Sequence, residues 1–303
     1  MDTLPVIAAF DGSDDSVRAL DWALDAARRR AAPLRVVYVR QYGAWAPAGI
    51  TVPMPPQTAG EPVLDQARDH LEGRIGSVPV AYAAVDGSPG ATLPELGAEA
   101  QLLVLGSRGR GGFASLLLGS NGMSAARDAE CPVVVVPRPG RELDGVPEAA
   151  PGPRVVAGLN VDGPDDAVLS FAFAEAALRG ARLQVVAAYP WPVQLWAGQP
   201  GELLPTGIDQ DAVEHEIRVL AEGFLAPHRA RHPDVGTEAY VAPGDAAGQL
   251  VAAAQGAVLT VVGRHRRRLL APARMIGSVT HAVLLHAPSP VAVVPPAPPE
   301  DAS

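Results

Sequence analysis

The chain has 303 residues, of which 48% are hydrophobic and 19% charged, a balance typical of globular proteins of one large or two smaller domains. Its formal net charge of -9 argues against a broad basic surface, so no nucleic-acid partner is expected. All 24 basic residues are arginine, which excludes any phosphate loop that depends on a lysine.

Cysteine content and apolar runs indicate the compartment. Cys131 is the one cysteine, so no internal disulfide can form, as is usual in a reducing environment. The first apolar run, 4–10, follows no basic segment, and no apolar run is long enough to cross a bilayer. We therefore expect a soluble, cytoplasmic protein with no membrane partner.

The predicted elements of the first half begin with a strand at 6–10, followed by the polar stretch DGSDDS. A helix follows, with Ser13 or Asp14 as its candidate cap and a repeating apolar face. Another strand is predicted at 34–39, and further strands open the segment LLVLGSRG and close the segment AECPVVVVP. Strands alternating with helices predict a parallel sheet covered on both faces.

The second half repeats these elements in the same order. Its strands lie at 154–159, at 183–188, and in the segments LTVVGRHR and APSPVAVVP. The distance in sequence between matching residues is nearly constant: Val6 matches Val155, 149 residues further on, and Gly106 matches Gly263, 157 residues further on. A nearly constant shift indicates two copies of one domain. We predict domain 1 at 1–139, a Pro- and Gly-rich linker at 140–153, and domain 2 at 154–297.

The predicted fold is α/β, with two tandem doubly wound domains. Each domain has a five-stranded parallel sheet flanked by helices, in the flavodoxin-like strand order 3-2-1-4-5. In such sheets, ligands bind beyond the carboxyl ends of the strands, where the strand order reverses. The first strand ends at Asp11 and the fourth at Gly106, so we expect Asp11 to face the glycine-rich segment that follows Gly106.

That segment, GSRGRGGFASLLLGS, has the features of a phosphate cradle. Gly106 and Gly109 let main-chain N–H groups approach a ligand, and Gly119-Ser120 begins a helix whose first N–H groups lack partners within the helix. A helix start favours an anion. Asp11 could hold a magnesium ion through water or accept a hydrogen bond from a ribose or an adenine. Two simpler interpretations remain: a plain strand–helix connection for the glycines, and a helix cap for Asp11.

These residues resemble a known signature. The spacing Gly106-x-x-Gly109, nine residues, Gly119-Ser120 is similar to the ATP-binding motif of universal stress proteins. DGSDDS after the first strand and the closing CPVVVVP fit the same family, and the resemblance extends over both halves. It departs at Asn121-Gly122, where a small apolar residue is usual. The fold of the family is also called adenine nucleotide alpha hydrolase-like.

The resemblance implies ATP as the ligand, with or without magnesium. The residues that match the adenine side of the family's site are Ala9, Phe10, Asp11 and Val39. The residues that match the ribose and phosphate side are Gly106, Arg108, Gly109, Gly119, Ser120 and Asn121.

The second copy departs from this motif. The second-copy candidates for binding are Asn160, Gly263, Gly277, Ser278 and Val279. Asn160 replaces the aspartate, Arg266 replaces the second glycine, and the interval to the helix start is one residue longer. The arginines of GRHRRR could supply charge to phosphates in place of backbone donors, or form a solvated loop in a copy that binds no nucleotide. We expect weakened or absent ATP binding here.

The resemblance and the residues together suggest a nucleotide-dependent stress sensor or regulator. We find no residue placed as an activated nucleophile or general base, so we expect no enzyme, or slow ATP hydrolysis at most. The alternatives are a slow hydrolase or nucleotidyl-type enzyme using Asp11 and magnesium, and a nucleotide-free interaction module. As partners we expect an adenine nucleotide, an unknown protein, and an internal pseudo-dimer of the two copies through their last strands, with a homodimer also open.

Overall fold

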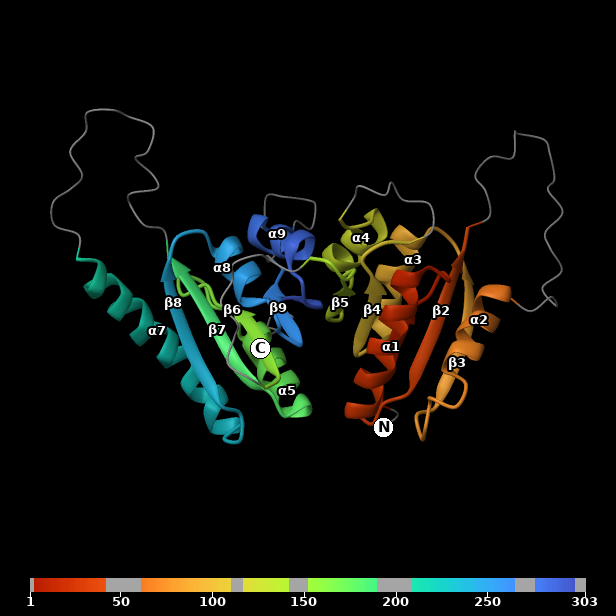
Figure 1. Cartoon of the computed structure of the whole chain (residues 1–303), viewed down its shortest axis with the longest axis horizontal. Helices are drawn as coiled ribbons and strands as arrows, with labels where there is room; N and C mark the ends of the chain where they lie inside the picture. The colour runs from red at the N-terminus through yellow and green to blue at the C-terminus, as the bar shows by residue number, and fades with distance from the viewer. Residues whose placement is uncertain are drawn as a thin grey trace, which may run out of the picture. The chain divides into compact units, whose positions relative to one another are not determined.

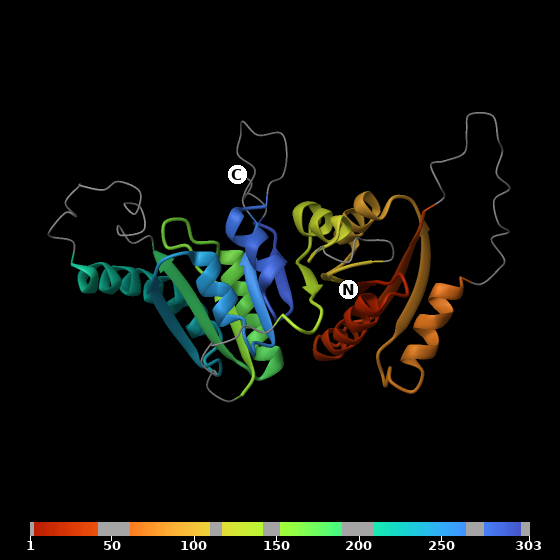
Figure 2. The same ribbon diagram turned by 45° about the horizontal axis from the view of Figure 1, so that its top comes forward.

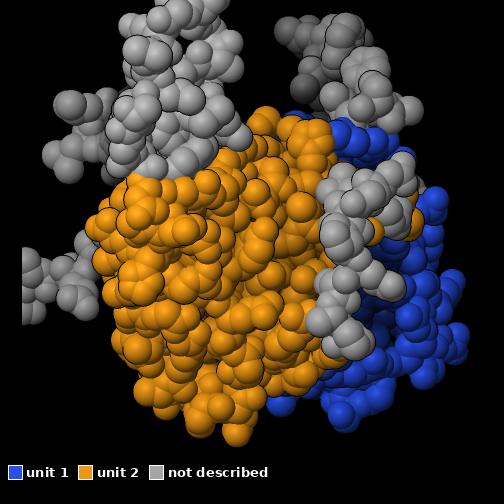
Figure 3. Space-filling model, turned by 60° about the vertical axis from the view of Figure 1, so that its left-hand side comes forward, with its two compact units in different colours: residues 1–138 blue, residues 139–303 orange. Residues whose placement is uncertain are grey.

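The computed structural model describes residues 3–41, 61–109, 117–141, 152–189, 209–264 and 276–297. Within these residues, strands and helices alternate along the chain (Figure 1). The chain divides into two compact units, unit 1 of residues 1–138 and unit 2 of residues 139–303, which Figure 3 colours separately.

The strands of unit 1 pair in parallel in the order β3-β2-β1-β4-β5. Their bounds are β1 Val6–Ala9, β2 Leu34–Arg40, β3 Val80–Asp86, β4 Leu102–Gly106 and β5 Val133–Val136. This is the predicted order, with its reversal between β1 and β4, so the prediction of the fold is confirmed. Every residue of β5 is buried, as expected for a parallel strand covered on both faces.

The helices of unit 1 cover the two faces of its sheet. They are α1 Asp14–Arg29, α2 Pro62–Leu71, α3 Pro89–Glu95 and α4 Ser120–Asp128, with the 3₁₀ turn η1 at Leu96–Glu99. Right-handed crossovers place α1 and α2 on one face and α3 and α4 on the other, because the strand order changes direction after β3. The packing of α3 against α4 agrees with this arrangement (Figure 2).

Unit 2 repeats the topology, with strands in the order β8-β7-β6-β9-β10. Its strands are β6 Arg154–Gly158, β7 Arg182–Tyr189, β8 Thr237–Pro243, β9 Leu259–Gly263 and β10 Val291–Val294. Its helices are α5 Asp166–Arg179, α7 Gln210–Arg231, α8 Ala246–Ala253 and α9 Ser278–His286. The internal repeat of the sequence is therefore a repeat of structure.

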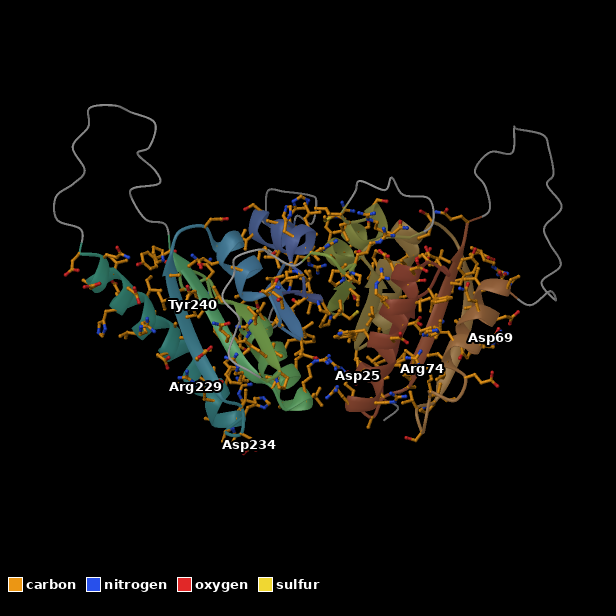
Figure 4. The ribbon with its side chains drawn as sticks, viewed as in Figure 1. Asp25, Asp69, Arg74, Arg229, Asp234 and Tyr240 are labelled. Carbon is orange, nitrogen blue, oxygen red and sulfur yellow. The ribbon has the colours of Figure 1, made fainter. Side chains whose placement is uncertain are left out.

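Local sequence determines where helix α1 begins. Ser13 is its N-cap, and its hydroxyl oxygen accepts from the N–H of Ser16 at 3.2 Å. Its first turn is acidic and its last turn is basic, which suits the helix dipole. Near the far end of α1, Asp25, labelled in Figure 4, pairs with Arg29 at 2.7 Å. The helix thus starts at a fixed residue, beside the carboxyl end of β1.

The start of α1 packs very closely against the end of β4. A Cβ atom at Gly106 would lie 2.5 Å from the carbonyl carbon and oxygen of Asp15, a distance that real contacts do not allow. Gly106 is therefore glycine because a helix backbone crosses it. The sequence analysis explained this glycine by the approach of a ligand, and the structure supplies a different reason.

Gly106→Ala should destabilise unit 1 by about 1–3 kcal/mol, because the added methyl group meets backbone that cannot rotate away. Gly90→Ala, in α3 of the same unit, is the matched control: its Cβ would find its nearest atom at 3.6 Å, an ordinary contact. Alanine also favours a helix over glycine. Urea unfolding followed by circular dichroism measures both. Equal stability of the two variants would contradict the close packing.

Candidate functional site

Asp11 is fixed in the turn that follows β1. One carboxylate oxygen, Oδ1, accepts from the N–H of Ser13 at 3.0 Å and from its hydroxyl at 2.6 Å. Gly12 between them has φ +77°, which glycine adopts most readily. The cap of α1 is Ser13, so the alternative interpretation of Asp11 as the cap is wrong. The turn holds Asp11 at the carboxyl edge of the sheet.

The second oxygen of Asp11 lies against the glycine segment. A Cβ atom at Gly109 would be 2.6 Å from Oδ2 of Asp11. A side chain at residue 109 would therefore displace this carboxylate. The expectation that Asp11 faces the segment after Gly106 is confirmed, although Asp11 and Gly109 are 98 positions apart in the sequence.

Gly119 joins the same place from the other side. Its N–H donates to the carbonyl oxygen of Ser107 at 2.8 Å, which closes the segment between β4 and α4. Gly119 is the N-cap residue of α4, and no side chain caps this helix. The N–H of Gly119 is already bonded to Ser107. The N–H groups of the first turn of α4 have no partner within the helix.

The remaining predicted residues lie around this edge. The Phe10 side chain is buried, and its N–H donates to the carbonyl oxygen of Val37 at 2.8 Å. Val39 is half-buried near the end of β2, where it pairs with Val85 of β3. Ala9 and Arg108 are half-buried, and Ser120 and Asn121 are exposed at the start of α4. The predicted set therefore surrounds the ends of β1, β2 and β4.

Asp15 is a buried carboxylate that the sequence analysis did not single out. Its side chain is fully buried in the first turn of α1. Oδ2 accepts from the hydroxyl of Ser107 at 3.0 Å, and Oδ1 accepts from Nε of Arg138 at 2.7 Å and from Arg18. Asp15 thus links α1 to Ser107, which directly follows β4, and to Arg138, which lies just beyond β5.

The charge of Asp15 is well compensated. Burial acts to raise the pKa of its carboxyl, but the hydrogen bonds from Arg138 and Ser107 and the charges of Arg18 and Arg138 lower it more. The net effect is a pKa below the ordinary value of an aspartate, so Asp15 is ionised at neutral pH. The sequence alone does not distinguish Asp15, because DGSDDS contains three aspartates and only the tertiary structure shows which of them is buried.

Unit 2 keeps part of the same arrangement. Asn160 repeats the turn of Asp11, since its Oδ1 accepts from the N–H of Asp162 at 3.2 Å. Gly263 again lies beneath a helix start, where a Cβ would meet Val168 at 2.9 Å and Asp165 at 3.3 Å. Gly277 caps α9, whose first residues are Ser278 and Val279. The arginines at 266–268 lie outside the described residues.

The two units differ at the carboxyl end of the second strand. Arg40 and Tyr189 are equivalent, because their carbonyl oxygens accept from Gly87 and Gly244, the matching glycines. In unit 1, Arg40 pairs with Glu61 at 3.0 Å and with Asp86 at 2.7 Å. In unit 2, Tyr189 belongs to an apolar cluster. The members of this cluster are Ala187, Tyr189, Val241, Val161, Val213 and Ile217.

Among the residues that the structure describes, no three His, Cys, Asp or Glu side chains gather as a metal site. Within the same residues, no helix has the length and apolar character needed to span a bilayer.

Known proteins are similar to this chain along its whole length. The profile of the universal stress protein family matches residues 4–137 and again 153–295. A universal stress protein of Mycobacterium tuberculosis is 33% identical over 299 residues, which cover 95% of this chain and 96% of that protein. One from Mycolicibacterium smegmatis is 30% identical over 305 residues, with 96% and 97% covered.

Solved structures share the fold. A universal stress protein from Archaeoglobus fulgidus has a TM-score of 0.61 at 17% identity and covers 97% of each chain. A protein from Pseudomonas aeruginosa has a TM-score of 0.64 at 18% identity, covering 96% of this chain and 93% of that one. Both likenesses support two tandem α/β domains.

The buried Asp15 predicts a pH dependence of stability. Because its pKa is lowered on folding, its contribution is complete above the pKa of an unfolded aspartate, about 3.9, and is lost as the pH falls through the folded value. Asp15→Asn should cost about 1–3 kcal/mol at neutral pH and progressively less in acid. Urea unfolding between pH 7 and pH 2 measures the difference. A constant difference across this range would show that the Asp15 charge is not used.

Proposed function

Because this chain belongs to the universal stress protein family, we propose that unit 1 binds ATP and that the chain acts as a nucleotide-dependent sensor or regulator in a stress response. The observation that supports this most is the meeting of Asp11, Gly109 and Gly119 at one edge of the sheet. These residues carry the family's motif, which is complete in unit 1.

The phosphates would lie at the start of α4. The cap residue Gly119 leaves room, since the nearest atoms to its Cβ position are 3.7 Å and 3.8 Å away. The first N–H groups of α4, with those of Arg108 and Gly109, would donate to phosphate oxygens. A helix start favours an anion by about 0.3–1 kcal/mol, and each hydrogen bond to a charged group adds about 1.5–3 kcal/mol. A phosphate cradle of this kind needs no lysine.

The nucleoside would lie toward β1 and β2. Asp11 holds its turn through Oδ1, and its Oδ2 would accept from a ribose hydroxyl or an adenine amine. Ala9, Phe10 and Val39 would provide main-chain and apolar contacts, with Phe10 limited to its backbone because its side chain is buried. If magnesium accompanies ATP, phosphate oxygens and water would complete its coordination around Asp11.

Unit 2 would bind ATP weakly or not at all. Arg264 stands at the position of Ser107, and Asn160 replaces the aspartate. The apolar cluster that contains Tyr189 lies at the end of β7, where the residue of unit 1 that matches Tyr189 is the charged Arg40. ATP would then occupy one site per chain.

The output of such a protein would be contact with another protein. Among the described residues near Asp11 none is arranged as a nucleophile with its base, and we propose a binding protein with slow hydrolysis at most. We also propose that β5 and β10, the last strands of the two copies, form an internal pseudo-dimer, because apolar edge strands need partners. A cytoplasmic location fits the single cysteine.

The nucleotide carried by the purified protein separates these functions. The protein is denatured, and the released molecule is identified by chromatography and mass spectrometry. ATP supports the proposal. ADP together with rapid turnover of added ATP supports an enzyme that uses Asp11 and magnesium. An empty protein whose melting temperature does not rise with ATP supports a nucleotide-free interaction module, because any ligand of the native state stabilises it.

Gly119→Glu should weaken the affinity for ATP about 100-fold or more, because a carboxylate would lie where the phosphates bind. The variant should fold, since Gly119 has φ -77° and a Cβ there meets only ordinary contacts. Gly277→Glu, at the equivalent cap of α9, is the matched control and should leave the affinity unchanged. Isothermal titration with ATP measures both. Loss of binding in Gly277→Glu alone would place the nucleotide in unit 2.

A further inference from the structure

The buried carboxylate of Asp15 has a role beyond the family's motif. We infer that Asp15 is a positioning residue for the nucleotide site of unit 1, acting through Ser107. The inference rests on the proposed function. Asp15 is fully buried, yet it accepts hydrogen bonds from Ser107, Arg138 and Arg18, which come from three different parts of unit 1.

The contact path from Asp15 to the phosphate cradle is short. The hydroxyl of Ser107 donates to Oδ2 of Asp15, and the carbonyl oxygen of the same residue accepts from the N–H of Gly119. The N–H of Ser107 donates to the carbonyl oxygen of Val136 at 2.9 Å. Ser107 is therefore held at all three of its polar groups, and the only side-chain bond among them goes to Asp15. The start of α4 is positioned on Ser107.

The backbone of Asp15 packs closely against the end of β4. The carbonyl group of Asp15 lies where a Cβ of Gly106 would stand, so α1 and the end of β4 are in direct contact. A fixed helix turn carrying a fixed carboxylate sets the orientation of the Ser107 hydroxyl. Preorganised donors bind an anion better than donors that must be ordered on binding, because the entropic cost has already been met.

A negative charge beneath an anion site would normally weaken binding. Here the two positive charges of Arg18 and Arg138 outnumber the single charge of Asp15. The cluster of Asp15, Arg18 and Arg138 therefore carries a net positive charge. Asp15 can orient Ser107 without making the cradle repulsive to phosphate.

Within the described part of unit 2, the residues that match this arrangement differ, as the inference expects for a copy with a degenerate motif. By the matched glycines, Ser107 corresponds to Arg264, and by the matched last strands, Arg138 corresponds to Pro296. By the shift of 149 residues that relates Asp11 to Asn160 and matches the buried faces of α1 and α5, Asp15 corresponds to Pro164. Asp15, Ser107 and Arg138 are each replaced by a residue of another type.

Asp15→Asn tests the inference, with Asp14→Asn as the matched control. Both changes remove one negative charge from the first turn of α1, but Asp14 is exposed. We expect Asp15→Asn to weaken ATP binding about 10-fold or more and Asp14→Asn to change it less than about twofold. Ser107→Ala should weaken binding to a similar degree, and adding it to Asp15→Asn should cost little more, because the two residues act as one unit.

Amide hydrogen exchange of the free protein gives a second readout that needs no nucleotide. Asp15→Asn should speed exchange at Gly119 by a larger factor than in the middle of α1, whereas a general loss of stability alone would speed both by the same factor. Should Asp15→Asn fail to fold, Ser107→Ala, which removes one hydroxyl, takes its place in both measurements.

The outcomes separate the two claims. If the wild-type protein binds no ATP, the proposed function fails, and faster exchange at Gly119 still supports positioning by Asp15. If the wild-type protein binds ATP and a folded Asp15→Asn binds it equally well, the inference about Asp15 is overturned and the proposed function stands. Unchanged exchange at Gly119 in the variant also overturns the inference.

Discussion

The arrangement of unit 1 depends on the contact between the first turn of α1 and the end of β4. Gly106 permits the backbone of Asp15 to lie where a side chain would otherwise be, and the carboxylate of Asp15 then reaches the hydroxyl of Ser107. This contact fixes the segment after β4 relative to the turn that holds Asp11. The edge that we propose as the nucleotide site is built on it.

The repeat explains why two units of one topology differ in chemistry. Both units place a glycine at the end of the fourth strand, where the start of a helix packs too closely for a side chain, and another at the cap of the last helix. The polar groups around these glycines are free to diverge without loss of the fold. Unit 1 has a charged cluster around Asp15. At the end of its second strand it has the ion pairs of Arg40, whereas unit 2 has apolar side chains around the equivalent Tyr189.

Much of this could be predicted from the sequence. The shift between the copies and the alternation of strands and helices predict the fold and its strand order, since a parallel sheet allows few topologies. The approach of Asp11 to Gly109 followed from that order. Asp15 could not be predicted, because its importance comes from burial. Arg138 lies two residues before the predicted linker, and nothing in the local sequence indicates its pairing with a residue of the first helix.

A crystal structure of the full chain with a non-hydrolysable ATP analogue tests the central claim most directly. Our account predicts one nucleotide per chain, with its phosphates against the first turn of α4 beside Gly109 and its base toward Val39. A nucleotide bound only in unit 2, or bound in unit 1 with its phosphates away from α4, would contradict it.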